Sequence, residues 1–290
     1  MADMTVRFFG VRGSIASPGE STAAFGGNTS CVEVRVGETR LILDSGTGIR
    51  ALGGLLLQDP KALAKGVEAT LLLSHLHWDH IQGLPFFAPI YMPHTKLRIC
   101  GEGSPELGLR EALSLQMRPP TFPVLWEDLP AQLSYRTLRH GQRFVIDDVE
   151  VRCAKLNHPG GGVLAYRLEH AGRSVVFATD TEHYECIDPT LLKLALGADV
   201  LIYDAQYLPE EYRGDVGMAK VGWGHSTYEA ATKLARAAGV GRLVLFHHDP
   251  SRDDAGVQAL EDRARAEFDR TECAREGREI VMPDVAERAA

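Results

Sequence analysis

The chain has 290 residues, of which 44% are hydrophobic and 24% are charged, and its formal net charge is −8. These values are typical of a globular protein, and the negative charge disfavours a protein that holds a long nucleic-acid backbone. No run of 18 apolar residues is present, and the first residues lack the basic and apolar parts of a signal peptide, so we expect a cytoplasmic protein with no membrane contact.

The first part of the chain is predicted to contain short strands separated by tight glycine loops. Arg12 lies in the loop GVRGS, and Asn28 lies in a second glycine segment, GGNT. Arg12 could contact a substrate phosphate, and a structural salt bridge is the alternative; the role of Asn28 is equally open. The strands are predicted over residues 5–9, 30–36 and 41–43, and the first helix over residues 49–57.

Residues 75–80 read HLHWDH and are the most informative part of the sequence. Imidazole nitrogens and carboxylate oxygens suit zinc, manganese or iron, and so dense a group suits two ions better than one. A solvated histidine-rich loop is the alternative, but a strand pattern before the motif and a helix pattern after it disfavour that alternative. The metal-competent side chains are His75, His77, Asp79 and His80.

The local geometry of this motif follows from the elements around it. Residues 69–74 read as a buried strand. If the chain stays extended beyond it, His75 and His77 point to the same side, because strand side chains have a period of two. Asp79 and the residue after it need a turn to reach a second ion. Asp79 is also a candidate N-cap for a helix predicted over residues 81–88.

Residues 84–135 are rich in proline and aromatic residues, with a helix predicted over residues 107–117. Because this segment directly follows the metal-binding motif, it is a candidate lid over the site. Its aromatic side chains either stack on a base or pack in the core, and packing is the favoured alternative. These side chains are Phe86, Phe87, Phe122 and Trp126.

Three metal-competent residues of the second half of the chain, His158, Asp180 and His247, each stand just past an apolar strand pattern. Each one alone would be interpreted as an ordinary turn residue. Their joint occurrence favours a functional cluster, since grouped histidines and aspartates mark metal or catalytic sites. The strands of this half are predicted over residues 134–138, 143–146, 149–156, 163–169, 173–178, 200–203, 243–245 and 279–282, and the last helix over residues 255–270.

The motif H-x-H-x-D-H after an apolar strand, followed by an isolated histidine, aspartate and histidine in that order, resembles the metallo-β-lactamase family of dinuclear metallohydrolases. The resemblance extends over nearly the whole chain. It implies an α/β fold, a four-layer αβ/βα sandwich, with residues 1–290 as one domain and residues 84–135 as a candidate lid insertion. The GVRGS loop and the GGNTSC segment resemble a bacterial subgroup whose members are uncharacterised or act on cyclic nucleotides.

The resemblance also implies a set of metal ligands. Asp180 would bridge the two ions. His247 is favoured over His248 as a ligand because of its place after the apolar strand, and His248 would then line the pocket or support a ligand. Asp44, in the sequence DSGTG, would support the metal-binding loop, although a simple helix cap is the alternative. One ion would be held by His75, His77 and His158, and the other by Asp79, His80 and His247.

Asp204 ends a predicted strand, and His225 precedes a helix predicted over residues 228–235. Ser226 or Thr227 can cap that helix. This arrangement resembles the phosphodiesterase branch of the family, which contains ribonuclease Z and small-molecule cyclic phosphodiesterases. The resemblance implies that the acid orients the histidine, which gives a proton to the leaving oxygen. Asp79, Asp204 and His225 are therefore the candidate catalytic residues.

Five cysteines are scattered along the chain without a Cys-x-x-C pair. An odd and dispersed set of this kind is typical of reduced cysteines rather than of a disulfide framework. We expect most of them to be buried. None stands within the metal-competent motifs, which disfavours a cysteine metal ligand.

Taken together, these motifs predict a dinuclear metal-dependent phosphodiesterase. It would hydrolyse a small phosphodiester such as a cyclic nucleotide, using a hydroxide that bridges the metals and an Asp-His proton donor. Zinc is the favoured metal, with manganese or iron as alternatives. A homodimer is left open, because dimers are common in the family that the chain resembles.

Two alternative enzymes share the same predicted site. One is a ribonuclease Z-like RNA-processing nuclease, which the net charge and the lack of a long, basic, glycine-rich insertion disfavour. The other is a lactonase or thioesterase, which has less need of the Asp204–His225 pair. A catalytically idle metal-binding module is disfavoured because every ligand position is filled.

Overall fold

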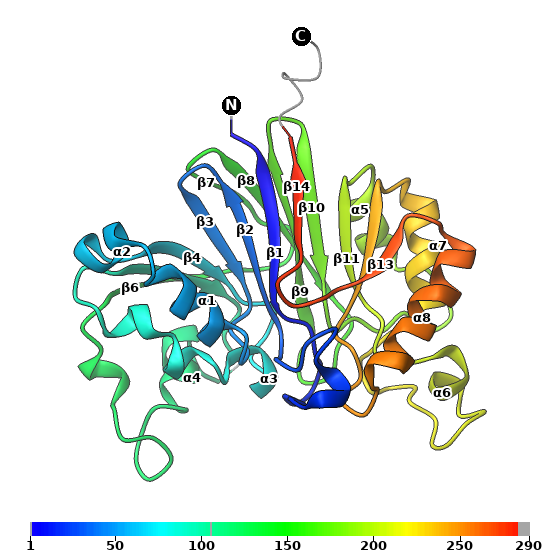
Figure 1. Cartoon of the computed structure of the whole chain (residues 1–290), viewed down its shortest axis with the longest axis horizontal. Helices are drawn as coiled ribbons and strands as arrows, with labels where there is room; N and C mark the ends of the chain where they lie inside the picture. Colours follow the sequence, from blue (N-terminus) through cyan, green and yellow to red (C-terminus); the bar gives the residue numbers. More distant parts are fainter. Residues whose placement is uncertain (1, 105, 284–290) are drawn as a thin grey trace.

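The computed structural model describes residues 2–104 and 106–283. Two seven-stranded mixed sheets form its centre (Figure 1). In the first sheet, the inner strands from β3 to β6 run parallel to one another, whereas β14, β1, β2 and β3 alternate in direction. The order of this sheet is β14 (Glu279–Met282), β1 (Met4–Gly10), β2 (Cys31–Val36), β3 (Thr39–Leu43), β4 (Glu68–Leu72), β5 (Lys96–Gly101) and β6 (Gln132–Thr137).

The second sheet repeats this plan. Its strands β10 to β13 are parallel, and β7 to β10 pair in antiparallel fashion. Because parallel neighbours end at the same edge, each sheet gathers several strand ends at one side of the molecule. The order is β13 (Thr271–Cys273), β12 (Arg242–Phe246), β11 (Val200–Asp204), β10 (Arg173–Ala178), β9 (Val163–His170), β8 (Val149–Leu156) and β7 (Arg143–Ile146).

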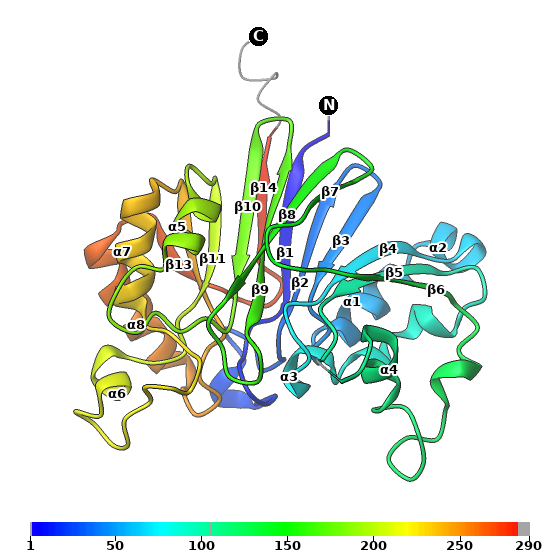
Figure 2. The ribbon, with the colours of Figure 1, turned by 180° about the vertical axis from the view of Figure 1, so that it is seen from behind.

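Helices cover the outer face of each sheet, as Figures 1 and 2 show from opposite sides. Helix α7 begins after Thr227, whose side chain accepts a hydrogen bond from the Ala230 amide, and it ends at Gly239 with a left-handed backbone. On the first sheet lie α1 (Ile49–Leu56), α2 (Pro60–Lys65), α3 (Trp78–Ile81) and α4 (Leu109–Ser114); on the second lie α5 (Pro189–Ala195), α7 (Tyr228–Ala238) and α8 (Asp254–Glu267). The short helix α6 (Pro209–Arg213) lies below α8 in Figure 1.

Three apolar cores separate the layers. The central core lies between the two sheets, where Phe8 of β1 and Phe246 of β12 have ring centroids 6.3 Å apart. A second core joins the first sheet to α1, α3 and α4, and a third joins the second sheet to α5, α7 and α8. Helix, sheet, sheet and helix therefore form the predicted four-layer αβ/βα sandwich, and this prediction is confirmed.

The segment after the HLHWDH motif differs from the prediction. The helix predicted over residues 81–88 is absent, because α3 ends at Ile81 and two short 3-10 turns follow, each with a proline in its first turn. Asp79 is not an N-cap; it lies inside α3, and the extended His77 precedes the helix. The two turns are η2 (Leu84–Phe86) and η3 (Ala88–Tyr91).

Within residues 84–135 the structure contains one strand, β5, that the sequence interpretation missed. It pairs in parallel with β4 and with β6, so part of the candidate lid belongs to the first sheet. Phe87 and Trp126 are buried in the core, which agrees with packing. Phe86 is 58% exposed and contacts the partly buried Phe122 edge-on. Two further predictions were imprecise: β13 was missed, and α8 ends at Glu267 rather than near residue 270.

Four of the five cysteines are buried, and all five are free. This result agrees with the interpretation of a reduced set. Among the described residues, no helix has the length and apolar character needed to cross a membrane.

Candidate metal centre and active site

The candidate ligands meet where strands of both sheets end. The HLHWDH motif leaves β4 of the first sheet, while His158, Asp180 and His247 follow β8, β10 and β12 of the second sheet. Asp180 and His247 have positive φ angles of 50° and 62°. Aspartate and histidine are among the residue types that tolerate this conformation, which turns each side chain from the strand end toward the centre of the site.

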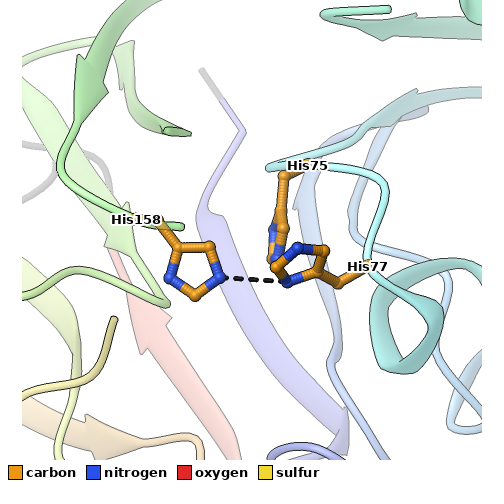
Figure 3. Close-up of side chains that lie close together, drawn as sticks. All are labelled: His75, His77 and His158. Atoms are coloured by element: carbon orange, nitrogen blue, oxygen red, sulfur yellow. Dashed lines mark hydrogen bonds between the residues drawn. The ribbon is translucent and has the colours of Figure 1, made fainter. Parts of the chain in front are cut away.

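Three histidines form the first group, drawn in Figure 3: His75, His77 and His158. Nε2 of His158 lies 3.0 Å from Nδ1 of His77. The rings of His75 and His77 are 4.4 Å apart, so both side chains point to the same side, as the extended geometry predicts. Nε2 of His75 is buried and has no hydrogen-bond partner among the described residues.

The second group contains Asp79, His80, Asp180 and His247, all buried. Nε2 of His80 and Nε2 of His247 each lie 3.2 Å from Oδ2 of Asp79. The two imidazole nitrogens are 3.3 Å from each other. Because Asp79 and His80 are consecutive residues of the single turn α3, that turn brings both side chains to this group.

Asp180 lies between the two groups and presents one oxygen to each. Its Oδ1 is 3.2 Å from Nε2 of His80 and 3.1 Å from Nε2 of His247. Its Oδ2 is 3.7 Å from Nε2 of His75 and 3.9 Å from Nε2 of His158. This is the arrangement that a bridging carboxylate requires.

Burial controls the protonation of the first group. It lowers the pKa of His75, His77 and His158, so these imidazoles are held neutral and keep a lone pair. Burial alone would raise the pKa of Asp180, but the neighbouring His247 and His80 hold it well below its usual range. The first group therefore offers neutral imidazoles beside an ionised carboxylate. In the second group, burial alone would lower the pKa of His80, but Asp180, Asp79 and Asp44 outweigh it and raise this pKa.

These residues fit two divalent metal ions. The buried Nε2 of His75 has no hydrogen-bond partner among the described residues. The facing imidazole nitrogens of the two groups lie 3.0 and 3.3 Å apart, close enough for each pair to share one cation. A cation held between the nitrogens would give Nε2 of His75 a partner and would be shared by the facing imidazoles. A set of histidines and carboxylates without thiolates suits zinc, manganese or iron.

The far nitrogens of four candidate ligands are fixed by hydrogen bonds, the first being Nδ1 of His75, 3.0 Å from Oγ of Ser74. Nδ1 of His80 lies 2.7 Å from Oδ2 of Asp44, so the prediction that Asp44 supports the metal-binding loop agrees with the geometry. Nδ1 of His158 lies 2.9 Å from the Gly224 carbonyl oxygen. Such contacts set the tautomer and turn Nε2 toward the cluster.

Gln206 fixes the far nitrogen of His247, and the sequence interpretation missed this residue. Its Oε1 lies 2.9 Å from Nδ1 of His247. Gln206 is buried at 3% exposure, and its backbone amide donates to Oδ1 of Asp204 at 3.0 Å. Its position two residues after the acid that ends a strand was the one available signal.

Asp204 and His225 form a pair at the edge of the cluster. Oδ2 of Asp204 lies 2.8 Å from Nδ1 of His225. Burial alone would lower the pKa of His225, but the Asp204 carboxylate outweighs it and raises the pKa to about 9. The His225 ring stacks on His247 at 4.9 Å, and its Nδ1 is 3.9 Å from Oδ2 of Asp180. The pair therefore faces the space between the two groups.

The GVRGS loop supports the cluster with its backbone. The Ser14 amide donates to Oδ2 of Asp79 at 2.8 Å. Gly13 packs directly under His247: a Cβ at this position would collide with the imidazole ring and lie 2.7 Å from Oε1 of Gln206. A glycine is therefore needed here for space rather than for a special backbone conformation.

Three side chains that were candidates for contact with the substrate or for support of a ligand bind other parts of the chain instead. The Arg12 side chain is fully buried and donates to the carbonyl oxygens of Gly26, Asp249 and Arg252, so it is unable to meet a phosphate. Asn28 donates to Glu276. His248 lies against Phe25 and the Ala274 carbonyl oxygen. All three hold loops together around the site.

Comparison with known proteins places this geometry in a family. The profile of the beta-lactamase superfamily domain matches residues 39–248. Ribonuclease Z of Mycolicibacterium gilvum (strain PYR-GCK) is 29% identical over 262 residues, covering 82% of this chain and 84% of that protein. Ribonuclease Z of Mycobacterium sp. (strain KMS) is 30% identical over 248 residues, covering 80% of this chain and 81% of that protein.

Solved structures share the fold at lower identity. The metallo-beta-lactamase fold protein YhfI from Bacillus subtilis has a TM-score of 0.71 at 19% identity, covering 97% of this chain and all of that one. The short form of human tRNase Z has a TM-score of 0.67 at 18% identity, covering 96% and 99%. A diphosphatase from the PhnP family has a TM-score of 0.68 at 16% identity, covering 96% and 97%.

Proposed function

The chain thus belongs to the beta-lactamase superfamily, and we propose that within it the protein is a two-metal phosphodiesterase acting on a small phosphodiester such as a cyclic nucleotide. It is a metal-dependent hydrolase. The observation that carries the proposal is the Asp204–His225 pair, whose side chains lie 2.8 Å apart and cluster with Asp180 and His247 of the candidate metal site.

His75, His77 and His158 would hold one ion, and Asp79, His80 and His247 the other, with Asp180 shared between them. When bound, two divalent ions lower the pKa of water and polarise a phosphoryl oxygen. We favour zinc because of the histidine-rich donor set, with manganese or iron as alternatives.

Asp204 and His225 would then supply a proton to the leaving oxygen. Asp204 accepts the hydrogen bond of the His225 Nδ1–H, so Nε2 is the atom that gives its proton to that oxygen. An alkoxide leaves poorly without a proton, and a positioned acid accelerates such a step by about 10²–10⁴-fold. Hydrolysis of a lactone or thioester has less need of this pair, which favours a phosphodiester.

Two observations favour a small substrate over a long RNA. The net charge of the chain is −8, whereas proteins that grip a nucleic-acid backbone usually present a basic face. The connection between His158 and Asp180 consists of the hairpin β9–β10, closed by a two-residue turn at residues 171–172, which leaves no room there for a substrate-holding arm.

An RNA-processing nuclease is the second candidate. The curated relatives at 29% and 30% identity both carry the name ribonuclease Z, and their alignments span most of this chain. The same candidate ligands and the same Asp204–His225 pair would serve either substrate. Only turnover distinguishes the two.

The deciding experiment measures hydrolysis by the protein loaded in turn with zinc, manganese and iron. The substrates are bis-p-nitrophenyl phosphate, a 2′,3′-cyclic nucleotide, a 3′,5′-cyclic nucleotide, a tRNA precursor, a lactone and a thioester. Turnover of a cyclic nucleotide without cleavage of the precursor supports the proposal. Cleavage of the precursor favours the nuclease, and turnover of only the lactone or thioester refutes the role given to Asp204 and His225.

A further inference from the structure

A surface segment at residues 214–223, here called the arm, leads directly into the candidate proton donor His225. It follows α6 and carries apolar side chains in solvent: Val216, Met218, Val221 and Trp223 are 61%, 70%, 54% and 49% exposed. In Figure 1 the arm lies beside α6 at the lower edge of the molecule, and α3, which carries Asp79 and His80, lies at the same edge in the other half. Of these four side chains, Trp223 stands nearest to His225 in the sequence, and an exposed apolar side chain in that position indicates a substrate contact.

One buried carboxylate fixes the end of the arm. Glu182 is 1% exposed and lies two residues after Asp180. Its Oε1 accepts hydrogen bonds from the Gly222 amide at 2.6 Å and the Tyr212 hydroxyl at 2.7 Å, and its Oε2 accepts from the Gly224 amide at 2.8 Å. Both neighbours of Trp223 are therefore bound to the same side chain, so the exposed indole is presented on a rigid backbone.

The position of the indole relative to the site follows from its contacts. The Lys220 ammonium lies 3.9 Å from the centre of the Trp223 ring and 5.9 Å from that of Tyr207. The Tyr207 ring in turn contacts His225, with centroids 5.8 Å apart. Trp223 thus stands on the His225 side of the cluster, with Lys220 over one of its faces.

We propose that Trp223 is a specificity-determining residue whose free indole face stacks on the base of a nucleotide substrate. The inference rests on the proposed function: His225 protonates the leaving oxygen, so the sugar that carries this oxygen, and its base, lie on the side where Trp223 stands. An indole stacks on any base because every base has a π-face. The Lys220 cation adds positive charge beside a cluster of acids, where a phosphate must approach.

The test compares two substrates that differ only in the base. The constants kcat and KM are measured for 2′,3′-cyclic AMP and for the 2,3-cyclic phosphate of methyl riboside, which has the same scissile bond and leaving alcohol. Trp223→Ala is expected to raise KM for the nucleotide roughly ten-fold or more, with kcat and the base-free substrate unchanged. Trp223→Phe is expected to recover most of the loss.

Met218→Ala is the matched control, because Met218 is an exposed apolar residue of the same arm that lies away from the Glu182 contacts. It is expected to leave both substrates unchanged. The inference is overturned if Trp223→Ala slows both substrates equally, or if Met218→Ala has the same effect as Trp223→Ala.

Failure of the proposed function gives a different pattern, in which the wild-type protein hydrolyses neither of these two substrates and none of the other phosphodiesters named above. The inference is then decided by calorimetric binding of AMP and of ribose 5-phosphate to the zinc-loaded protein. AMP binding that is roughly ten-fold tighter in the wild type than in Trp223→Ala, with ribose 5-phosphate unaffected, supports stacking. Equal AMP binding by the two proteins overturns it.

Discussion

Asp180 is the residue on which both candidate metal groups depend. Its Oδ1 faces His80 and His247, and its Oδ2 faces His75 and His158. Removal of the carboxylate takes one ligand from each group and leaves Asp79 as the one carboxylate among the candidate ligands. A single substitution is therefore expected to affect two ions.

Asp180→Ala is predicted to lose metal and activity together. Elemental analysis of the purified variant should find one ion or fewer per chain where the wild type holds two, and turnover should fall to the background rate. Asp128→Ala, which removes an exposed acid of the turn η4 (Trp126–Asp128), is the control and should keep both ions. Two ions bound to Asp180→Ala would contradict the bridging role.

His225 makes a contrasting prediction, because it contacts the candidate ligands without joining either of the two proposed ligand sets. His225→Ala should keep two ions. It should lose about 10²–10⁴-fold in kcat on an alkyl phosphodiester, whose alkoxide needs a proton, and much less on a p-nitrophenyl ester, whose phenolate leaves unaided. If the variant keeps its full rate on the alkyl ester, His225 is not the proton donor.

At the scale of the element, the GVRGS loop shows how a motif without reactive side chains shapes the site. Gly13 lies under the His247 ring, and the amide of Ser14 bonds to Asp79. The loop thereby sets the distance between two candidate ligands of one ion. Its arginine secures the loop from behind through three backbone carbonyl oxygens.

Gly13→Ala is predicted to weaken binding of the second ion by about 10–100-fold, the usual cost of disturbing a contact behind a ligand. The added methyl group must displace either the His247 ring or Gln206. Gly19→Ala is the matched control, since a Cβ there has open space around it. Competition with a chromogenic chelator measures both affinities, and equal values for the two variants would contradict the steric argument.

A site residue could be predicted from the sequence when the residues next to it in the chain already mark it. The HLHWDH motif and the lone His158, Asp180 and His247 stand out because each follows an apolar strand. Gln206 and Glu182 gave no such signal, since their partners lie 41 and 42 residues away at His247 and Gly224. Their roles emerge only when the chain folds.

The helices and strands were likewise predicted correctly where the local sequence pattern is clear, and missed where it is not. Strand β8 was predicted at its observed bounds because its apolar residues alternate clearly, whereas the three-residue β13 is too short to show a pattern. The helix expected over residues 81–88 failed because Pro85 and Pro89 break helical hydrogen bonding. Strand β5, KLRICG, alternates in burial but stands in a segment dominated by proline and aromatic signals.

At the scale of the molecule, each of the two proposed ions would join the two halves of the sandwich. The HLHWDH motif extends from the first sheet, whereas His158, Asp180 and His247 extend from the second. The central apolar core already holds the sheets together. At the edge where the ligands meet, the contacts are between buried imidazoles and carboxylates, and a cation is needed to balance them.

Metal binding is therefore predicted to raise the thermal stability of the whole sandwich. A ligand present at 100 times its Kd adds about 2.7 kcal/mol to the free energy of unfolding, which corresponds to a rise of several degrees in Tm for a chain of this size. Zinc added to metal-free protein should produce this rise in differential scanning calorimetry. Calcium, which prefers oxygen ligands, should produce little, and Asp180→Ala should lose most of the zinc effect. If zinc binds with a stoichiometry of two but leaves Tm unchanged, zinc binds the unfolded chain as tightly as the folded one, and the folded cluster is not the site that holds it.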